Sequence, residues 1–121
     1  VVMDEFAESY PHLVEAFVKA ECEGIDYWIN NPAKTAAIIA KELELPLKDA
    51  TRMMGGTGMV PCDEQITAGY IGATGDIGQF ADTLVATSEF LVAQDRLPKQ
   101  LTREDYEVFL TPSYLETVVA N

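Results

Sequence analysis

Glycine-rich turns are the part of this sequence with the most direct route to chemistry, because backbone N–H groups at a helix start can bind phosphate. Residues 72–78 read Gly-Ala-Thr-Gly-Asp-Ile-Gly and resemble a dinucleotide-binding fingerprint. That fingerprint needs a buried strand before the turn and a parallel strand after the helix. The flanking sequence predicts neither, so we expect a flexible loop capped by Asp76.

A second glycine-rich turn, Gly55-Gly-Thr-Gly58, lacks the Gly-Lys-Ser/Thr ending of a phosphate-binding loop. It follows a segment with helical spacing. The simplest interpretation is that these glycines end a helix and form a hinge or turn. We therefore predict no nucleotide site and no cofactor.

The ionisable residues do not assemble a catalytic set. His12 is the single histidine, and no serine, cysteine or carboxylate pair lies at a compelling spacing from it. The acidic pairs Asp63-Glu64 and Glu104-Asp105 are neighbours at helix starts, where the helix dipole already explains them. No nucleophile, base and oxyanion site come together, so we expect a protein that is not an enzyme.

The two cysteines are far apart in sequence. Cys22 falls on the apolar face of a predicted helix, and Cys62 follows Pro61 in a predicted loop. We expect two unpaired thiols, and a disulfide between them is the open alternative. Neither cysteine has a neighbour at metal-ligand spacing, so the sequence predicts no metal site.

Charge and hydropathy limit the partners. The 121 residues include 20 acidic and 8 basic residues, which gives a formal net charge of −12. This charge opposes binding to nucleic acid and to anionic membranes. No run of about 18 apolar residues is present, so we predict no membrane insertion. The first residues lack a signal-peptide pattern; a signal was removed upstream or never existed, and the product is cytoplasmic if Met3 is the native start.

Helical spacing dominates the chain. Pro11 occupies the place of a first-turn proline, with Ser9 ahead of it as a candidate cap. Apolar residues then follow at three- and four-residue steps as far as Ile29. The sequence Asn30-Asn31-Pro32 ends this helix, because a residue before proline disfavours helical dihedral angles. Thr102 and Asp105 form a capping-box pattern. We predict helices over 11–30, 32–43, 47–54, 62–68 and 76–94, one starting at 102, and a last one starting at 112.

These elements define the fold class. The prediction is all-α: a single helical domain over residues 1–121, built as a bundle of about five to seven helices. Only Val1 to Met3 is strand-like, and it has no partner strand. One short N-terminal strand is therefore kept as an option.

Several motifs resemble one family in order and spacing. They are Asp4-Glu-Phe-Ala-Glu-Ser-Tyr-Pro11, the helix opening Pro11-His-Leu-Val-Glu-Ala-Phe17, Ile39-Ala-Lys-Glu-Leu-Glu-Leu45, and the segment from Thr87 to Pro98. Together they resemble the C-terminal segment of periplasmic solute-binding proteins of the sulfonate, taurine and nitrate ABC importer family. The resemblance extends over about residues 1–115. Met53-Met-Gly-Gly and Cys62 depart from the family pattern.

The resemblance implies a fold and a function. The fold would be the C-terminal helical part of a type II periplasmic binding protein. The function would be the capture of taurine or related small organic anions for an ABC permease in the periplasm. Most ligand contacts in that family come from earlier parts of the sequence, so binding by this chain is expected to be weak or absent. Among its residues Thr57, near the family's cleft, is the candidate ligand-binding residue.

Three interpretations of function are open: a truncated or partial receptor, an independent helical module for protein interaction or oligomerisation, and a small helical enzyme or carrier that nothing specific favours. In a complete receptor these helices pack on a sheet that this chain lacks. Apolar residues that would face the sheet need another cover, so we expect a homo-oligomer. The candidates are Phe6, Phe17, Trp28, Phe80, Leu84, Phe90 and Phe109.

Overall fold

The computed structural model describes residues 1–121 as eight helices and one small hairpin. The helices are α1 (Asp4–Ser9), α2 (Pro11–Asn30), α3 (Pro32–Glu42), α4 (Leu47–Gly55), α5 (Cys62–Gln65), α6 (Phe80–Ala93), α7 (Arg103–Glu107) and α8 (Ser113–Val119). Strand β1 (Gly72–Ala73) pairs antiparallel with β2 (Asp76–Ile77). The predicted all-α class is confirmed. The additional helix is α1, which was not predicted, and the helix predicted over 62–68 ends at Gln65.

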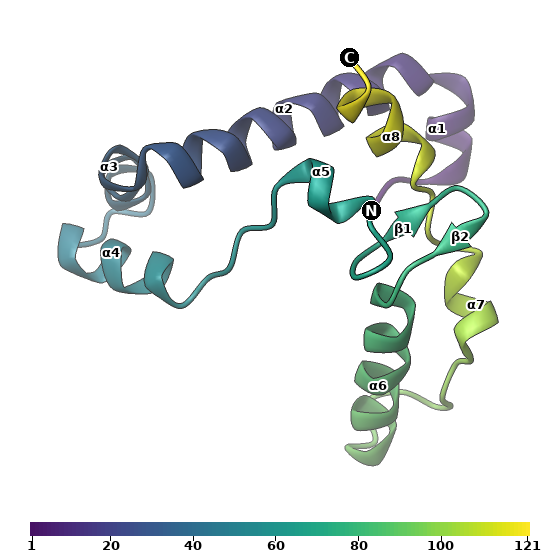
Figure 1. Ribbon diagram of the computed structural model, residues 1–121. Helices are drawn as coiled ribbons and strands as arrows, with labels where there is room; N and C mark the ends of the chain where they lie inside the picture. Colours follow the sequence, from purple (N-terminus) through teal and green to yellow (C-terminus); the bar gives the residue numbers. More distant parts are fainter.

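The elements form an open arch and not a bundle (Figure 1). The long helix α2 is the span, with α3 and α4 at one end and α1 and α8 at the other. The hairpin lies below α8, and from it α6 descends as a second limb beside α7. The two limbs are α4 on one side and α6 on the other, and they make no extensive contact with each other.

Prolines explain the clearest boundaries. Tyr10 before Pro11 and Asn31 before Pro32 both leave the helical region, at φ −135° and φ −132°, because a proline ring crowds the preceding residue. Each proline then opens a helix in the first-turn position it tolerates. The helix predicted to open at Pro11 and to end at Asn30-Asn31-Pro32 is present as α2, and the capping box of Thr102 and Asp105 is present at the start of α7.

Other expectations were wrong near the termini and the glycine turn. Val1–Met3 form no strand, since no partner strand exists, and Ser9 is the last residue of α1 and caps nothing. Asp76 lies in β2 and does not cap a helix, so the helix predicted from 76 starts at Phe80. The segment 72–78 is an ordered hairpin, in which Gly72 and Gly75 both take φ +84°. Glycine tolerates this left-handed conformation.

Little of the chain is buried. Only 10 of 121 residues are buried, and the large apolar ones among them are Val14 of α2 and Leu115 of α8. Alanines fill the other contacts: Ala36 and Ala50 lie in the adjacent helices α3 and α4, and Ala81 in α6. The chain exposes 8707 Å². A compact monomer of 13.3 kDa exposes about 6,450 Å², so roughly 2,250 Å² is in excess.

A disulfide joins Cys22 of α2 to Cys62 at the start of α5, with 5.8 Å between the Cα atoms. The expectation of two unpaired thiols was therefore wrong. The chain returns beneath α2 after α4 (Figure 1), which brings two cysteines 40 residues apart into contact. No helix has both the length and the apolar character needed to span a membrane.

Candidate functional site

An apolar groove lies beside α2. Two hollows of about 460 and 400 Å³ share Trp28 as a wall. We call them together the Trp28 groove. The first is lined by Trp28, Pro32, Ala33, Ala36, Leu47, Thr51, Met54 and Gly55, and the second by Ala20, Glu21, Gly24, Ile25, Trp28 and Met59.

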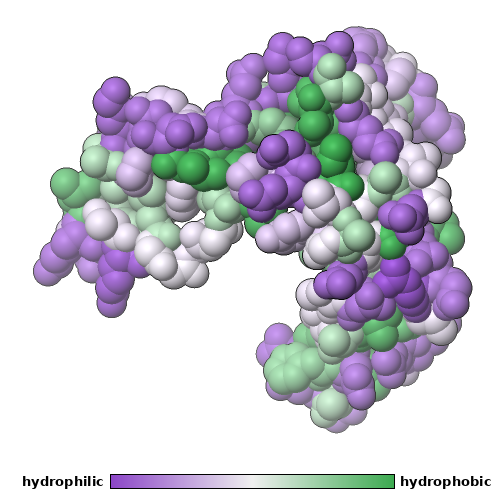
Figure 2. All heavy atoms as spheres, viewed as in Figure 1, coloured by the Kyte–Doolittle hydropathy of each residue, from purple (hydrophilic) through white to green (hydrophobic).

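The groove exists because small residues leave space beside large ones. Ala20 and Gly24 present little side chain on α2, and no atom lies within 4 Å of where a Cβ of Gly24 would be. The turn at Asn31 and Pro32 then carries α3 and α4 away from the axis of α2. Hydrophilic residues cover the upper side of the span, whereas hydrophobic residues gather on its lower side, facing the hollow of the arch (Figure 2).

The chemistry of the groove is apolar. Its only charged lining residue is Glu21. The hydroxyl of Thr51 already donates to the carbonyl oxygen of Leu47 at 2.9 Å. The carboxylate of Glu21 would repel a sulfonate. The apolar walls would accept aliphatic or aromatic side chains. The groove therefore offers no positively charged group to an anion.

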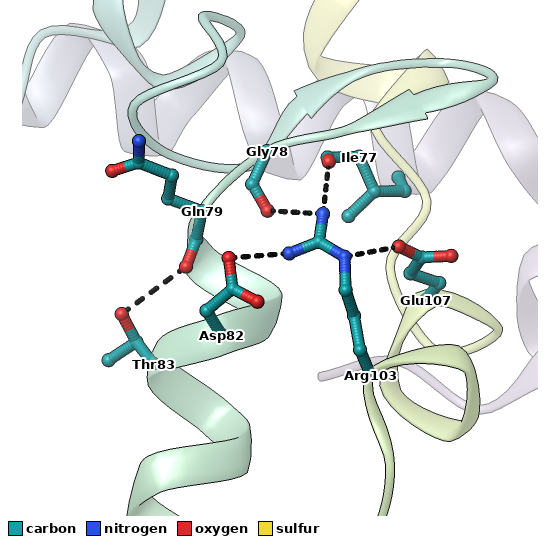
Figure 3. A network of polar contacts seen from close by, with 7 residues as sticks. All are labelled: Ile77, Gly78, Gln79, Asp82, Thr83, Arg103 and Glu107. Atoms are coloured by element: carbon teal, nitrogen blue, oxygen red, sulfur yellow. Dashed lines mark hydrogen bonds and ion pairs between the residues drawn. The ribbon is translucent and has the colours of Figure 1, made fainter.

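A polar cluster surrounds Arg103 (Figure 3). Its Nη1 contacts Asp82 Oδ2 at 2.6 Å and its Nε donates to Glu107 Oε1 at 2.7 Å. Nη2 donates to the carbonyl oxygens of Ile77 and Gly78 at 2.6 and 3.3 Å. One guanidinium thus ties the end of the hairpin, the first turn of α6 and α7 together.

The electrostatics of this cluster are satisfied internally. The hydrogen bond and charge of Asp82 raise the pKa of Arg103 above its ordinary value, and Glu107 adds to the effect. Every edge of the guanidinium plane is engaged, so Arg103 has no free fork for a ligand anion. The cluster is a joint that positions α6.

The hairpin turn is held from the other side by α8. Glu116 accepts from the backbone N–H of Thr74 at 2.9 Å and from its hydroxyl at 2.6 Å. These bonds lower the pKa of the Glu116 carboxyl, because they favour its charged form. Tyr114 adds a longer bond to the carbonyl oxygen of Ala7 at 3.4 Å, which links α8 to α1.

Thr57, the predicted ligand-binding residue, lies outside the Trp28 groove and the Arg103 cluster. Its hydroxyl is exposed and donates to the carbonyl oxygen of Met53 at 3.0 Å, so it ends α4. His12 is exposed in the first turn of α2. The acidic pairs 63–64 and 104–105 lie in the first turns of α5 and α7. The structure brings none of these candidates together, and no group of three or more metal-binding side chains is formed.

The features that sequence reasoning missed are the Arg103 cluster, the Thr74–Glu116 contact and the groove. Only one had a local signal: Arg103 directly follows the cap Thr102 and precedes Glu107 by four residues, an offset typical of helix ion pairs. Comparisons with protein-family models, curated proteins and solved structures found no match. The resemblance to solute-binding proteins therefore stays a prediction that rests on sequence motifs.

Proposed function

We propose that this chain is a partial substrate-binding component of an ABC importer for taurine- or sulfonate-like small organic anions, unable to hold the anion alone. The single observation that carries the proposal is the exposed surface of 8707 Å² with 10 buried residues. A helical part that packs on the sheet of a receptor lobe would leave such apolar faces uncovered when separate. The choice of family rests on the resemblance of the motifs between residues 4 and 98 to solute-binding proteins.

The disulfide supports a periplasmic location. Disulfides persist in oxidising compartments and are rare in the cytosol, where thiols are kept reduced. A bond between Cys22 and Cys62 fits the periplasm, where binding components deliver ligand to the permease of an importer. A cytoplasmic product starting at Met3 would hold these two thiols reduced.

The arrangement of charge supports weak or absent anion binding by this chain alone. The Trp28 groove contains Glu21 and no basic residue. Arg103 is occupied by Asp82, Glu107 and two carbonyl groups. The sulfonate would be held by groups on polypeptide outside this chain, and the arch would serve as scaffold.

The second candidate function is an independent helical interaction module. The specific observation in its favour is the groove itself, an apolar and preformed surface on a strongly acidic chain. The two candidates differ in what covers the apolar faces: the remainder of a receptor in the first, and a separate protein in the second.

Calorimetry with taurine and ethanesulfonate tests the first candidate. The chain alone should give no binding heat at millimolar ligand. Sequencing of the upstream genomic DNA should reveal a continuous reading frame for the remainder of a receptor. That polypeptide, co-expressed with the chain, should bind taurine with micromolar Kd, about 8 kcal/mol. Micromolar binding by the chain alone, or a promoter and start codon at Met3, would contradict the proposal. Thr57→Ala should leave the co-expressed pair unaffected.

A further inference from the structure

Helix α6 is the second apolar surface of the molecule. It carries two charged residues, Asp82 and Glu89, which lie on one side of the helix by their seven-residue spacing. Another side carries Phe80, Leu84, Thr87 and Leu91 at steps of three and four residues. The only extensive helix contact of α6 is with α7. A helix with this composition is normally covered on more than one side.

The exposed side of α6 has no partner within its own chain. Leu84 and Leu91 are half-buried, whereas Phe80 is 39% exposed and Phe90, on the neighbouring side of the helix, is 59% exposed. Ala81 and Ser88 face the covered side. The Trp28 groove is lined mainly by residues of α2, α3 and α4, and α6 makes no extensive contact with any of these helices. One chain thus holds an apolar helix with large side chains and an apolar groove lined in part by small residues, and the two do not contact each other.

We propose that the occupant of the Trp28 groove is α6 of a second copy of this chain, docked reciprocally across a two-fold axis. In such an isologous dimer each copy gives one helix and one groove, and both unpartnered surfaces are covered at once. Phenylalanines enter hollows lined by Ala20, Gly24 and Ala33, so large side chains meet small ones. This inference does not rest on the proposed function.

The area to be covered agrees with a stable dimer. The open arch exposes roughly 2,250 Å² more surface than a compact monomer of this mass, and a reciprocal dimer covers part of this excess. Obligate dimers bury about 1,000 to 2,500 Å² per partner, so the excess is large enough to supply such an interface. The two surfaces carry three of the acidic residues, Glu21 in the groove and Asp82 and Glu89 on another side of α6, and Asp82 is paired with Arg103. Repulsion between the remaining charges is screened over about 8 Å at physiological salt.

Two substitutions test the two halves of the contact. Phe90→Glu places a carboxylate on the exposed side of α6, and Gly24→Lys fills the groove. Both should preserve the fold of a single chain, because Phe90 is exposed and nothing lies within 4 Å of a Cβ at Gly24. By multi-angle light scattering the unaltered chain should be a dimer at micromolar concentration. Each variant should raise the dimer dissociation constant roughly tenfold or more, with unchanged helix content by circular dichroism.

Mixing the two variants gives the decisive measurement. The Gly24→Lys chain keeps an intact α6, and the Phe90→Glu chain keeps an intact groove. A mixed dimer therefore retains one native contact, and in the other contact the introduced lysine faces the introduced glutamate. The mixture should dimerise more strongly than either variant alone. Phe109→Glu, at a position 72% exposed after α7, is the control and should remain a dimer.

Several outcomes would overturn the inference. They are a monomeric unaltered chain at micromolar concentration, association that survives both variants, a mixture no stronger than its components, and loss of the dimer in the Phe109→Glu control. These outcomes are independent of taurine binding: a monomer that binds no taurine leaves the proposed function in place, and a dimer that binds taurine alone removes it.

Discussion

The carboxylate of Glu116 on α8 binds the turn between β1 and β2 through Thr74, accepting both the backbone N–H and the hydroxyl. The two residues are 42 positions apart, and their contact fixes the hairpin against the end of the arch. The hairpin in turn leads directly into α6. Glu116 therefore helps to set the direction of the limb that carries the apolar side of α6.

This contact predicts a pH-dependent contribution to stability. The folded-state pKa of Glu116 is lowered by Thr74, so the contribution is present above the ordinary glutamate pKa and is lost as pH falls through the folded value. Glu116→Gln should lower the Tm at pH 7, and its difference from the unaltered chain should shrink on acidification below about pH 4. Thermal unfolding at fixed protein concentration measures it. An undiminished difference at about pH 2, well below the ordinary glutamate pKa, would show that the charge of Glu116 contributes nothing.

Arg103 predicts a ranked series at the joint between hairpin, α6 and α7. Arg103→Ala removes the ion pairs and the bonds to Ile77 and Gly78, whereas Arg103→Lys keeps the charge and loses the planar fork. Amide exchange in the first turn of α6 should be fastest for the alanine variant, intermediate for lysine and slowest for the unaltered chain. Arg96→Ala is the control, because Arg96 is exposed and its side chain forms no ion pair or hydrogen bond. Equal exchange in lysine and unaltered chains would contradict a role for the fork.

The sequence was sufficient to predict the features that depend on neighbouring residues. Prolines at 11 and 32 fix their own φ and restrict the preceding residue, so the start of α2 at Pro11 and its end just before Pro32 could be predicted. The Thr102 cap is equally local, because donor and acceptor lie three residues apart. Periodicity also gave α4 to within one residue, since Gly55-Gly56 ends the helix.

The sequence was insufficient wherever a contact joins distant segments. Strands of two residues have no measurable alternation, so the hairpin could not be separated from a loop. The cysteine pair, the Thr74–Glu116 contact and the bonds from Arg103 to the hairpin depend on how the arch returns on itself. Helical periodicity identified apolar faces, but it could not show that α6 and the Trp28 groove lie on separate limbs.

The disulfide predicts a large loss of stability on reduction. Cross-linking positions 40 residues apart restricts the unfolded chain, worth about 4 kcal/mol in the loop-entropy estimate. The double variant Cys22→Ser, Cys62→Ser should lower the free energy of unfolding by about 2–4 kcal/mol in urea titration. Reductant should destabilise the unaltered chain by a similar amount and leave the double variant unchanged. A reductant effect of equal size in both would mean that the bond is not its cause.

Two glycines should respond in opposite ways to substitution by alanine. Gly24 lies in the interior of α2 with open space around its Cβ position, so Gly24→Ala should raise the free energy of unfolding by about 0.5–1 kcal/mol through helix propensity.

Gly78 is buried beneath the hairpin, and a Cβ there would overlap the carbonyl oxygens of Tyr70 and Ala68. Backbone must then move, which breaks the bond from the N–H of Gly78 to Ile71 and disturbs the Arg103 joint. Gly78→Ala should therefore destabilise the chain by ~3 kcal/mol, at the upper end of ordinary single substitutions. Urea titrations of both variants at equal concentration check the pair, and a neutral Gly78→Ala would contradict the close packing of the hairpin on which the position of α6 depends.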